Sequence, residues 1–378
     1  MPQSANFCKW DDAIYSQGGN AMNWTRRQFN RLAALGTATG LAPGAHGQLS
    51  TRKLGYCVVG LGRISMQHFM PATKTSQYAK VTGIVSGHRD KAERLAAEYG
   101  VPTKNIYNYD NYNGIAGNPD IDAVYIGLPN SMHADFTIRA AKAGKHVLCE
   151  KPMATSVAEA EAMDDACRKA NRKLMIAYRC HFEPAHVRAF QLIRDGKLGK
   201  IEAIDSAFGF NIAAGEWRLK KALAGGGPLM DVGIYCLNAC RHLTGEEPVE
   251  IKGYSSVVDQ DGRFREVEEN VSWSMKFPSG AVASCSTTYG ANMTSYFRVL
   301  GSKGELIVEP AFGYDGQRLR ATIGGEAPID EPSTMKDPGC FVSQADHFAT
   351  CVFGNREPGP NGAEGIKDMK LMAAIYRG

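Results

Sequence analysis

The sequence predicts two domains: an α/β domain with a doubly wound parallel sheet, then an α+β domain with a large open antiparallel sheet. Up to about residue 178, short apolar runs alternate with amphipathic stretches. Beyond residue 180, strand-like segments follow one another without helices between them. The 378 residues are also too many for one ordinary core. We expect boundaries at 1–48 for an upstream extension, 49–178 for the first domain and 179–378 for the second.

The elements of the first domain follow from apolar runs and from the residues that end them. Gly100 and Gly144 each follow an amphipathic stretch, where glycine commonly ends a helix. Strands are predicted at 53–62, 81–87, 121–130, 145–152 and 173–180, and helices from about Ser65 and at 90–100, 133–144 and 156–171. In a parallel sheet of this kind, ligands bind at the carboxyl ends of the strands.

The second domain is predicted from a series of short segments with turn residues between them. The stretch FPSGAVAS at 277–284 has the pattern of a hairpin turn. Strands are predicted at 201–211, 249–258, 269–277, 281–289, 295–300 and 304–309. Neighbouring strands joined by short turns favour antiparallel pairing.

Composition excludes several classes of protein. Hydrophobic residues make up 44% and charged residues 22% of the chain, as in soluble globular proteins. The net charge of +4 and the lack of a long Lys/Arg run argue against nucleic acid as a partner. No apolar run predicts a membrane anchor, and the ten cysteines have neither CxxC nor zinc spacing. We therefore expect neither a metal site nor a disulfide framework.

The N-terminal region has the pattern of an export signal. Residues 25–36 read TRRQFNRLAALG, a twin-arginine start followed by a weakly apolar stretch. This predicts export of the folded protein to the periplasm. The alternative is a short amphipathic helix that contains Arg26 and Arg27 by chance, which would leave the protein in the cytoplasm.

The stretch VVGLGRIS at 58–65 predicts a dinucleotide site of the Rossmann type. It contains Gly60-x-Gly62-x-x-Ser65 between a strand and a helix. The first glycine permits a tight turn, the second permits close approach of a pyrophosphate, and the third position packs the helix on the strand. The predicted phosphate-binding residues are Gly60, Leu61, Gly62, Arg63 and Ile64. The alternative is an ordinary glycine-rich turn.

The end of the second strand favours NADP over NAD. The sequence there is VSGHRDKA, with Ser86 where NAD sites usually carry an acidic residue. Arg89 and Lys91 follow closely, and a hydroxyl with cationic groups suits a 2′-phosphate. The alternative is a solvated helix start with incidental basic residues.

Three further residues have the pattern of a catalytic site. In LCEKP, Glu150 and Lys151 stand at the end of a predicted parallel strand, before Pro152, whose peptide bond we expect to be cis. In GGGPLMDVGIY, the spacing of four between Asp231 and Tyr235 puts both on one face of a helix, and the glycines before them are expected to let this helix approach a ligand closely. The alternatives are a surface Glu–Lys pair and a core tyrosine.

These motifs resemble the glucose–fructose oxidoreductase, inositol dehydrogenase and MocA family of nicotinamide-dependent sugar oxidoreductases. The shared stretches include VVGLGRIS, GLPNSMHAD, the EKP tripeptide, LMIAYRCHFEP and WRLKKALAGGGPLMDVGIY. The resemblance is strongest to the branch of glucose–fructose and aldose–aldose oxidoreductases, because Tyr235 stands where most of the family has histidine. It covers residue 53 to nearly the end.

The resemblance implies roles for individual residues. Lys151 is expected beside the nicotinamide and the reacting hydroxyl, Asp231 to orient the sugar, and Tyr235 to act as acid and base. A free tyrosine, with a pKa near ~10, is a poor base, so we expect the Lys151 ammonium to lower the pKa of Tyr235. Further residues expected at the cofactor are Leu128, Pro129, Asn130, His133, Glu150, Lys151, Arg179, Trp217 and Arg218.

The predicted function is sugar oxidation with tightly bound NADP(H). An exported enzyme cannot draw on free NADP, so a second sugar is expected to reoxidise the cofactor in a ping-pong exchange. The alternatives are a conventional NADP-dependent sugar or cyclitol dehydrogenase, a non-catalytic nucleotide sensor, and a glycoside hydrolase that uses nicotinamide. The exposed face of the antiparallel sheet is expected to form a homodimer or homotetramer.

Overall fold

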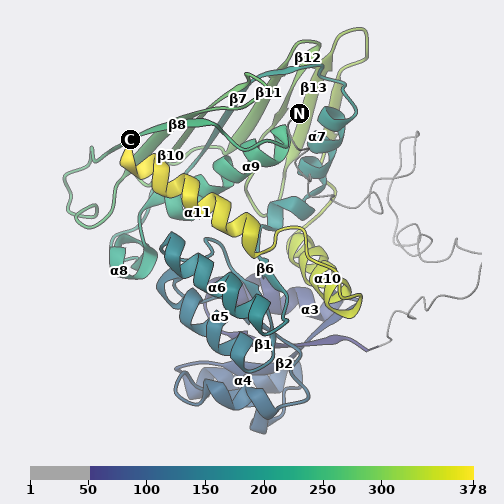
Figure 1. The fold of residues 1–378 in the computed structure, drawn as a ribbon, viewed down its shortest axis with the longest axis vertical. Helices are drawn as coiled ribbons and strands as arrows, with labels where there is room; N and C mark the ends of the chain where they lie inside the picture. Colours follow the sequence, from purple (N-terminus) through teal and green to yellow (C-terminus); the bar gives the residue numbers. More distant parts are fainter. Residues whose placement is uncertain (1–51) are drawn as a thin grey trace, which may run out of the picture. The chain divides into compact units, whose positions relative to one another are not determined.

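A computed structural model of the protein describes residues 52–378 (Figure 1). The predicted export signal at 25–36 lies outside these residues. The first sheet has the order β3-β2-β1-β4-β5-β6, and all its paired strands are parallel. Its strands are β1 (Leu54–Val59), β2 (Ala79–Val85), β3 (Ile106–Tyr107), β4 (Ala123–Ile126), β5 (His146–Cys149) and β6 (Leu174–Ile176). The predicted doubly wound sheet is confirmed, and its strand order reverses between β1 and β4.

The helices of this half begin and end close to the predicted residues. Gly100 and Gly144 have left-handed φ values of 68° and 74°, which suit glycine after a helix. Ser156 caps α6 by accepting a hydrogen bond from the backbone N–H of Glu159. The helices are η1 (Ser65–Phe69), α3 (Met70–Thr75), α4 (Arg89–Tyr99), η2 (Thr103–Asn105), η3 (Tyr112–Gly117), η4 (Asn130–Met132), α5 (His133–Lys142) and α6 (Val157–Lys169).

The second sheet has eight strands within the described residues, in the order β14-β13-β12-β11-β7-β10-β9-β8. It is antiparallel apart from β7 and β10, which pair in parallel. The predicted hairpin turn is confirmed between β9 and β10. The strands are β7 (Ile201–Gly209), β8 (Glu250–Ser256), β9 (Asn270–Lys276), β10 (Val282–Thr288), β11 (Tyr296–Gly301), β12 (Gly304–Val308), β13 (Arg318–Ile323) and β14 (Ile329–Pro332). The strand prediction stopped at 309 and so missed β13 and β14.

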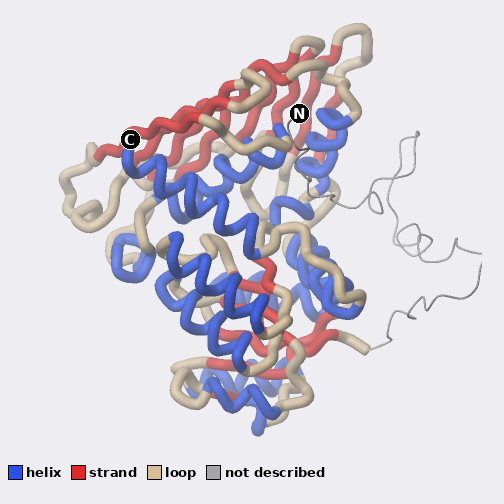
Figure 2. Tube along the Cα trace, viewed as in Figure 1, coloured by secondary structure: helices blue, strands red, loops and turns tan. Residues whose placement is uncertain are grey.

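Helices cover one face of this sheet (Figure 2). Along β9 the side chains of Val271, Trp273 and Met275 are buried while those of the intervening serines are exposed, so this strand presents polar side chains on its other face. The helices of this half are η5 (Arg179–Phe182), α7 (Pro184–Arg194), η6 (Trp217–Leu219), α8 (Lys221–Ala224), η7 (Leu229–Gly233), α9 (Ile234–Thr244), α10 (Gly339–Phe353) and α11 (Gly362–Arg377).

Helix α10 packs against the first sheet although it comes late in the chain. Phe341 and Phe348 belong to the same buried cluster as Tyr56 of β1 and Phe69 of η1. The Tyr56 hydroxyl donates to the carbonyl oxygen of Ala345 at 3.3 Å. The division at residue 178 separates the two sheets, but by packing α10 belongs with the first.

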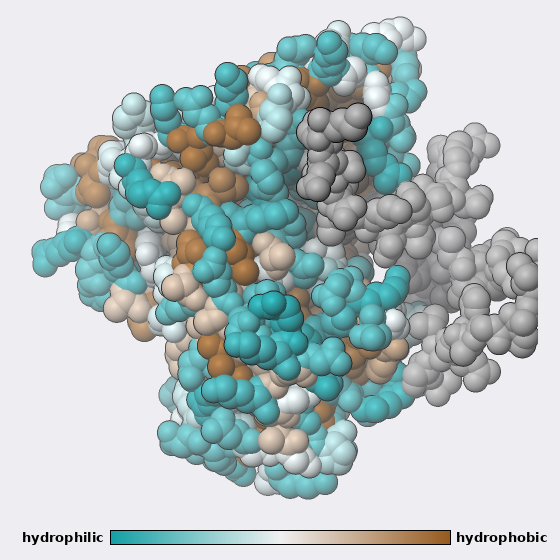
Figure 3. Space-filling model, in the orientation of Figure 1, coloured by the Kyte–Doolittle hydropathy of each residue, from teal (hydrophilic) through white to brown (hydrophobic). Residues whose placement is uncertain are grey.

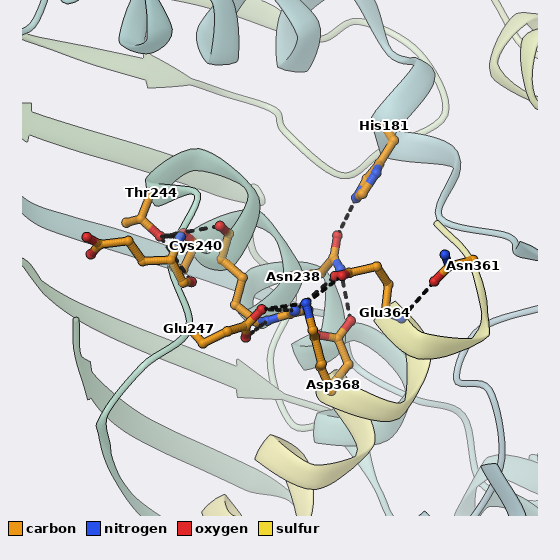
Figure 4. A network of polar contacts seen from close by, with 11 residues as sticks. His181, Asn238, Cys240, Thr244, Glu247, Asn361, Glu364 and Asp368 are labelled. Carbon is orange, nitrogen blue, oxygen red and sulfur yellow. Dashed lines mark hydrogen bonds and ion pairs between the residues drawn. The ribbon is translucent and has the colours of Figure 1, made fainter. Parts of the chain in front are cut away.

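A buried ionic network joins α9 to α11 (Figure 4). Arg241 is 5% exposed and donates to Asp368 at 2.5 Å, to Glu364 at 2.9 Å and to both oxygens of Glu247 at 2.6 Å. Asn238 extends the network, because its amide donates to Asp368 at 2.9 Å. These contacts fix α9, which begins directly after η7, against the C-terminal helix.

Three further features of residues 52–378 concern membrane spans, metal sites and cysteines. None of their helices is long and apolar enough to cross a membrane. They contain no group of three or more His, Cys, Asp or Glu side chains placed to hold a metal ion. Their nine cysteines are free and buried.

Candidate active site

The predicted phosphate turn has the backbone that a dinucleotide site requires. Gly60 has a φ of 90°, and a Cβ there would lie 2.8 Å from the carbonyl oxygen of Gly127. Gly62 is exposed, and a Cβ there would meet only that oxygen, at 3.7 Å. Ser65 is fully buried, and its hydroxyl has no hydrogen-bond partner in the described structure. An open glycine beside an unsatisfied hydroxyl at a helix start fits a pyrophosphate.

The residues at the end of β2 are partly engaged within the chain. The Ser86 hydroxyl accepts from the backbone N–H of His88 at 3.1 Å, and Arg89 forms an exposed ion pair with Glu93. Lys91 donates to the carbonyl oxygen of Leu61 at 2.6 Å. Lys91 therefore fixes α4 to the phosphate turn, and the contact of these side chains with a 2′-phosphate stays a prediction.

The His133 side chain is buried among backbone groups that follow β4 and β5. It is fully buried, with Nδ1 2.9 Å from the carbonyl oxygen of Pro152 and Nε2 3.0 Å from that of Leu128. Burial lowers its pKa. A neutral ring can donate to only one of these two carbonyl oxygens, so His133 packs between the segments that follow β4 and β5, and its contact with the cofactor stays a prediction. Asn130 is similarly engaged, since its amide donates to the carbonyl oxygen of Ala224 at 2.9 Å.

The structure brings Lys151, Asp231 and Tyr235 together at the carboxyl end of β5. The Lys151 ammonium lies 2.7 Å from the backbone oxygen of Asp231, 3.2 Å from its carboxylate, and 4.7 Å from the centre of the Tyr235 ring. The Lys151–Pro152 bond is cis, as expected. Side chains separated by about 80 residues thus form one cluster.

The Asp231 carboxylate is held by three groups. Besides Lys151, Arg218 pairs with it at 3.0 Å and the hydroxyl of Tyr289 donates to it at 2.8 Å. Burial would raise the pKa of Asp231, but the two cations and the tyrosine outweigh this and lower it to about 2. Asp231 is therefore ionised throughout the physiological range.

The pKa of Tyr235 differs from the expectation. Burial raises its pKa well above the usual value, and among neighbouring charges Arg179 opposes this most. The Lys151 ammonium, 4.7 Å from the centre of the ring, does not offset the effect of burial. The expected lowering of the Tyr235 pKa is wrong here, and Tyr235 is a neutral phenol that can donate a proton.

Arg179, Glu150 and the pair Trp217–Arg218 surround this cluster. The Arg179 guanidinium lies 5.3 Å from the centre of the Tyr235 ring. Glu150 accepts from the Tyr125 hydroxyl at 2.7 Å, and burial raises its pKa. Arg218 packs over the Trp217 ring at 4.9 Å while it binds Asp231. These predicted residues thus border the catalytic cluster.

The glycine-rich turn before Asp231 has a different purpose from the one expected. Gly226 and Gly227 were expected to let the helix approach a ligand closely. A Cβ on Gly226 would instead lie 2.3 Å from the Tyr376 hydroxyl, and one on Gly227 2.4 Å from the carbonyl oxygen of Glu268. The glycines therefore make room for other parts of the same chain, which corrects the stated reason.

Two tyrosines in the site were missed from the sequence. Tyr289 directly follows β10, and Tyr314 lies in the loop between β12 and β13. The Arg179 guanidinium is 4.4 Å from the centre of the Tyr314 ring. Neither tyrosine belongs to a local sequence motif. The fold brings Tyr289 beside Asp231 and Tyr314 beside Arg179, so their positions in the site could not be inferred from the sequence around them.

Comparison with known proteins identifies the family. Residues 54–178 match the oxidoreductase family with an NAD-binding Rossmann fold, and residues 186–307 match the GFO/IDH/MocA C-terminal domain. The chain belongs to the GFO/IDH/MocA family. The resemblance noted in its motifs and its predicted fold are both confirmed.

Two relatives within the GFO/IDH/MocA family are informative. D-xylose 1-dehydrogenase [NADP(+)] of Haloarcula marismortui is 31% identical over 331 residues, which are 85% of this chain and 89% of the relative. The crystal structure of aldose–aldose oxidoreductase from Caulobacter crescentus, complexed with glycerol, is 45% identical with a TM-score of 0.83. That match covers 86% of this chain and 97% of the other.

Proposed function

We propose that this GFO/IDH/MocA oxidoreductase acts on sugars with tightly bound NADP(H). It oxidises an aldose to its lactone and then reduces a second sugar in the same site. The observation that carries the proposal is the cluster of Lys151, Asp231 and Tyr235 at the edge of the parallel sheet, beside the phosphate turn. The likeness to aldose–aldose oxidoreductase supports it.

The residues that would hold NADP are the 60–65 turn and the ends of β2, β4 and β5. When bound, NADP supplies the hydride acceptor and donor. In the reducing half, neutral Tyr235 donates its proton to the sugar carbonyl oxygen, and the cations of Lys151 and Arg179 stabilise the phenolate. In the oxidising half, the phenolate takes back a proton from the aldose hydroxyl. Asp231 stays ionised and accepts a hydrogen bond from a neighbouring hydroxyl.

The raised pKa of Tyr235 predicts different pH dependences for the oxidising and reducing halves of the reaction. Oxidation needs the phenolate, whose fraction rises about tenfold per pH unit below the pKa. The single-turnover rate of aldose oxidation is expected to rise steadily from pH 6 to 9, while the rate of sugar reduction stays flat. Rapid-mixing absorbance at each pH measures both rates. A flat oxidation profile in the wild type would contradict this role, and Tyr235→Phe, which has no phenol, should abolish the slope.

Cofactor retention is the part of the proposal that separates it from ordinary dehydrogenases. The twin-arginine pattern around Arg26 and Arg27 supports periplasmic export with the cofactor already bound. A conventional enzyme that releases NADP each turnover is the second candidate. The name of the Haloarcula relative favours it.

The test uses purified, extensively dialysed protein. Bound nicotinamide is released by heat and identified by mass, which also distinguishes NADP from NAD. We expect about one NADP(H) per chain, reduced by an added aldose and reoxidised by a second sugar with nothing else present. Protein that is empty, and that oxidises sugars only with added NADP, would favour the conventional dehydrogenase.

Self-association through the second sheet is also proposed. Figure 3 shows hydrophobic surface around β7 and β8 among hydrophilic residues. Tyr254 of β8 is 82% exposed, and Val249, Val258 and Val282 are also exposed nearby in the fold. Exposed apolar side chains on an open sheet support a homodimer or homotetramer.

A further inference from the structure

The loop at 309–317 joins the phosphate half of the site to its catalytic half. Arg179 donates to the backbone oxygen of Phe312 at 2.6 Å and to that of Gly313 at 2.8 Å. Arg179 follows β6 and is 4% exposed, so it is a rigid anchor. These bonds hold the loop beside Tyr235, over whose ring the same guanidinium lies.

Tyr314, in this loop, is held by two neighbouring side chains, His68 and Arg179. The ring of His68 stacks on it with centroids 4.1 Å apart and an interplanar angle of 16°. The Arg179 guanidinium lies on the ring at 4.4 Å. Tyr314 nevertheless stays 43% exposed. One part of the ring is thus held fixed while another remains available.

His68 connects Tyr314 to α10. It lies in η1, the helix that starts at the phosphate turn, and its Nδ1 is 2.9 Å from both carboxylate oxygens of Asp337. The ring of Phe341 stacks on His68 at 5.3 Å. The backbone N–H of Asp337 donates to Asp315 at 2.7 Å, which ties this segment back to the loop.

Tyr314 therefore lies between the phosphate turn and the catalytic tyrosine. His68, which stacks on its ring, belongs to the helix that follows the phosphate turn, and Arg179, which also contacts its ring, contacts Tyr235. The Tyr314 phenol also interacts electrostatically with Tyr235, Arg179 and Lys151. The exposed part of the ring thus borders the space between the two ends of a bound dinucleotide.

We propose that Tyr314, held by His68, Asp337 and Arg179, is a clasp that packs on the nicotinamide half of the cofactor and slows its release. The proposal rests on the proposed function, since it requires that a nicotinamide dinucleotide binds along the 60–65 turn and Lys151. Tyr314 thus helps to retain the cofactor through a contact made by the described part of the chain. An aromatic ring fixed before binding loses little entropy when a planar ring packs on it.

The experiment measures the dissociation rate of NADPH from reloaded protein by displacement with excess NADP, followed by fluorescence. Loss of one aromatic stack is expected to speed release roughly tenfold in Tyr314→Leu. His68→Leu, which removes the stacked ring, should change the rate in the same direction. Tyr314→Phe keeps the ring and should retain the slow release. Tyr254→Leu, an exposed tyrosine on β8, is the matched control and should leave the rate unchanged.

The outcomes separate this proposal from the proposed function. If Tyr314→Leu and His68→Leu both release NADPH within twofold of the wild-type rate, the clasp is wrong, whatever the wild type does. If the wild type releases its cofactor between turnovers but the variants release it tenfold faster, the closed exchange fails and the clasp stands. If the wild type binds no NADPH, both fail. Unchanged melting temperatures show that faster release is not a result of unfolding.

Discussion

Replacing Lys151 by methionine is expected to lower kcat for sugar oxidation by about 10²–10⁴-fold, the range typical of a group that acts on proton transfer. The variant removes the cation that binds Asp231 at 3.2 Å and lies against the Tyr235 ring. Without it, the phenolate of Tyr235 loses one of its two cationic neighbours. Methionine keeps most of the side-chain volume, so packing should change little.

Steady-state kinetics and nicotinamide content together test this prediction. Lys151→Met should still bind NADP(H), because the phosphate turn is unaltered, so kcat should fall while the nicotinamide content stays at about one per chain. The matched control is Lys370→Met, which breaks an exposed ion pair with Glu161 far along the chain and should retain full activity. A Lys151→Met enzyme with wild-type turnover would instead revive the interpretation as a non-catalytic nucleotide sensor.

The backbone geometry of the phosphate turn could be predicted, because it depends on residues that are close together in the sequence. Gly60, Gly62 and Ser65 lie in one turn, and a single strand–turn–helix unit fixes their geometry. The meeting of Lys151 with Asp231 and Tyr235 is different, because residues 80 apart in sequence form it. It was predicted only through the family's motifs, since no periodicity relates the end of one strand to a helix in another domain.

What could not be predicted depends on contacts between distant segments. The sequence shows Tyr235 as a residue near a lysine, but its protonation state depends on burial and on where the ammonium points. Because the Tyr235 phenol is desolvated by the residues packed around it, its pKa rises instead of falling, despite the nearby Arg179 charge. Tyr289 and Tyr314 were missed for a related reason, since each meets the site only after the second sheet has formed.

The pairing of β7 with β10 illustrates the same limit at the level of the fold. A run of strands suggests antiparallel neighbours, and most pairs in the second sheet are antiparallel. Strand β7 instead enters the sheet between β11 and β10 and pairs with β10 in parallel. Helices α8 and α9, which follow β7 in the chain, make such a crossover feasible. Strand-like segments can be found in a sequence, but which of them become neighbours depends on the whole chain.

The buried network around Arg241 leads to a prediction of stability. Arg241→Met would leave the fully buried Asp368 carboxylate without its cation and is expected to lower the free energy of unfolding by about 3–5 kcal/mol. The loss should include activity, because α9 carries Tyr235 and is fixed to α11 by this network (Figure 4). Chemical denaturation, followed by fluorescence, measures the change.

The control for this prediction compares the buried ion pair of Arg241 with an exposed ion pair. Arg318→Met breaks an ion pair with Asp330 whose side chains are 48% and 50% exposed, and should change the free energy of unfolding far less, because solvent screens an exposed pair. The double variant Arg241→Met/Asp368→Leu removes the stranded carboxylate and should recover part of the loss. If Arg241→Met cost no more than Arg318→Met, water would have to reach Asp368, and the network could not be what holds α9 in place. A large loss that the second substitution partly reverses would show that the cost lies in the unpaired buried charge, and that the helix bearing the catalytic tyrosine depends on its pairing.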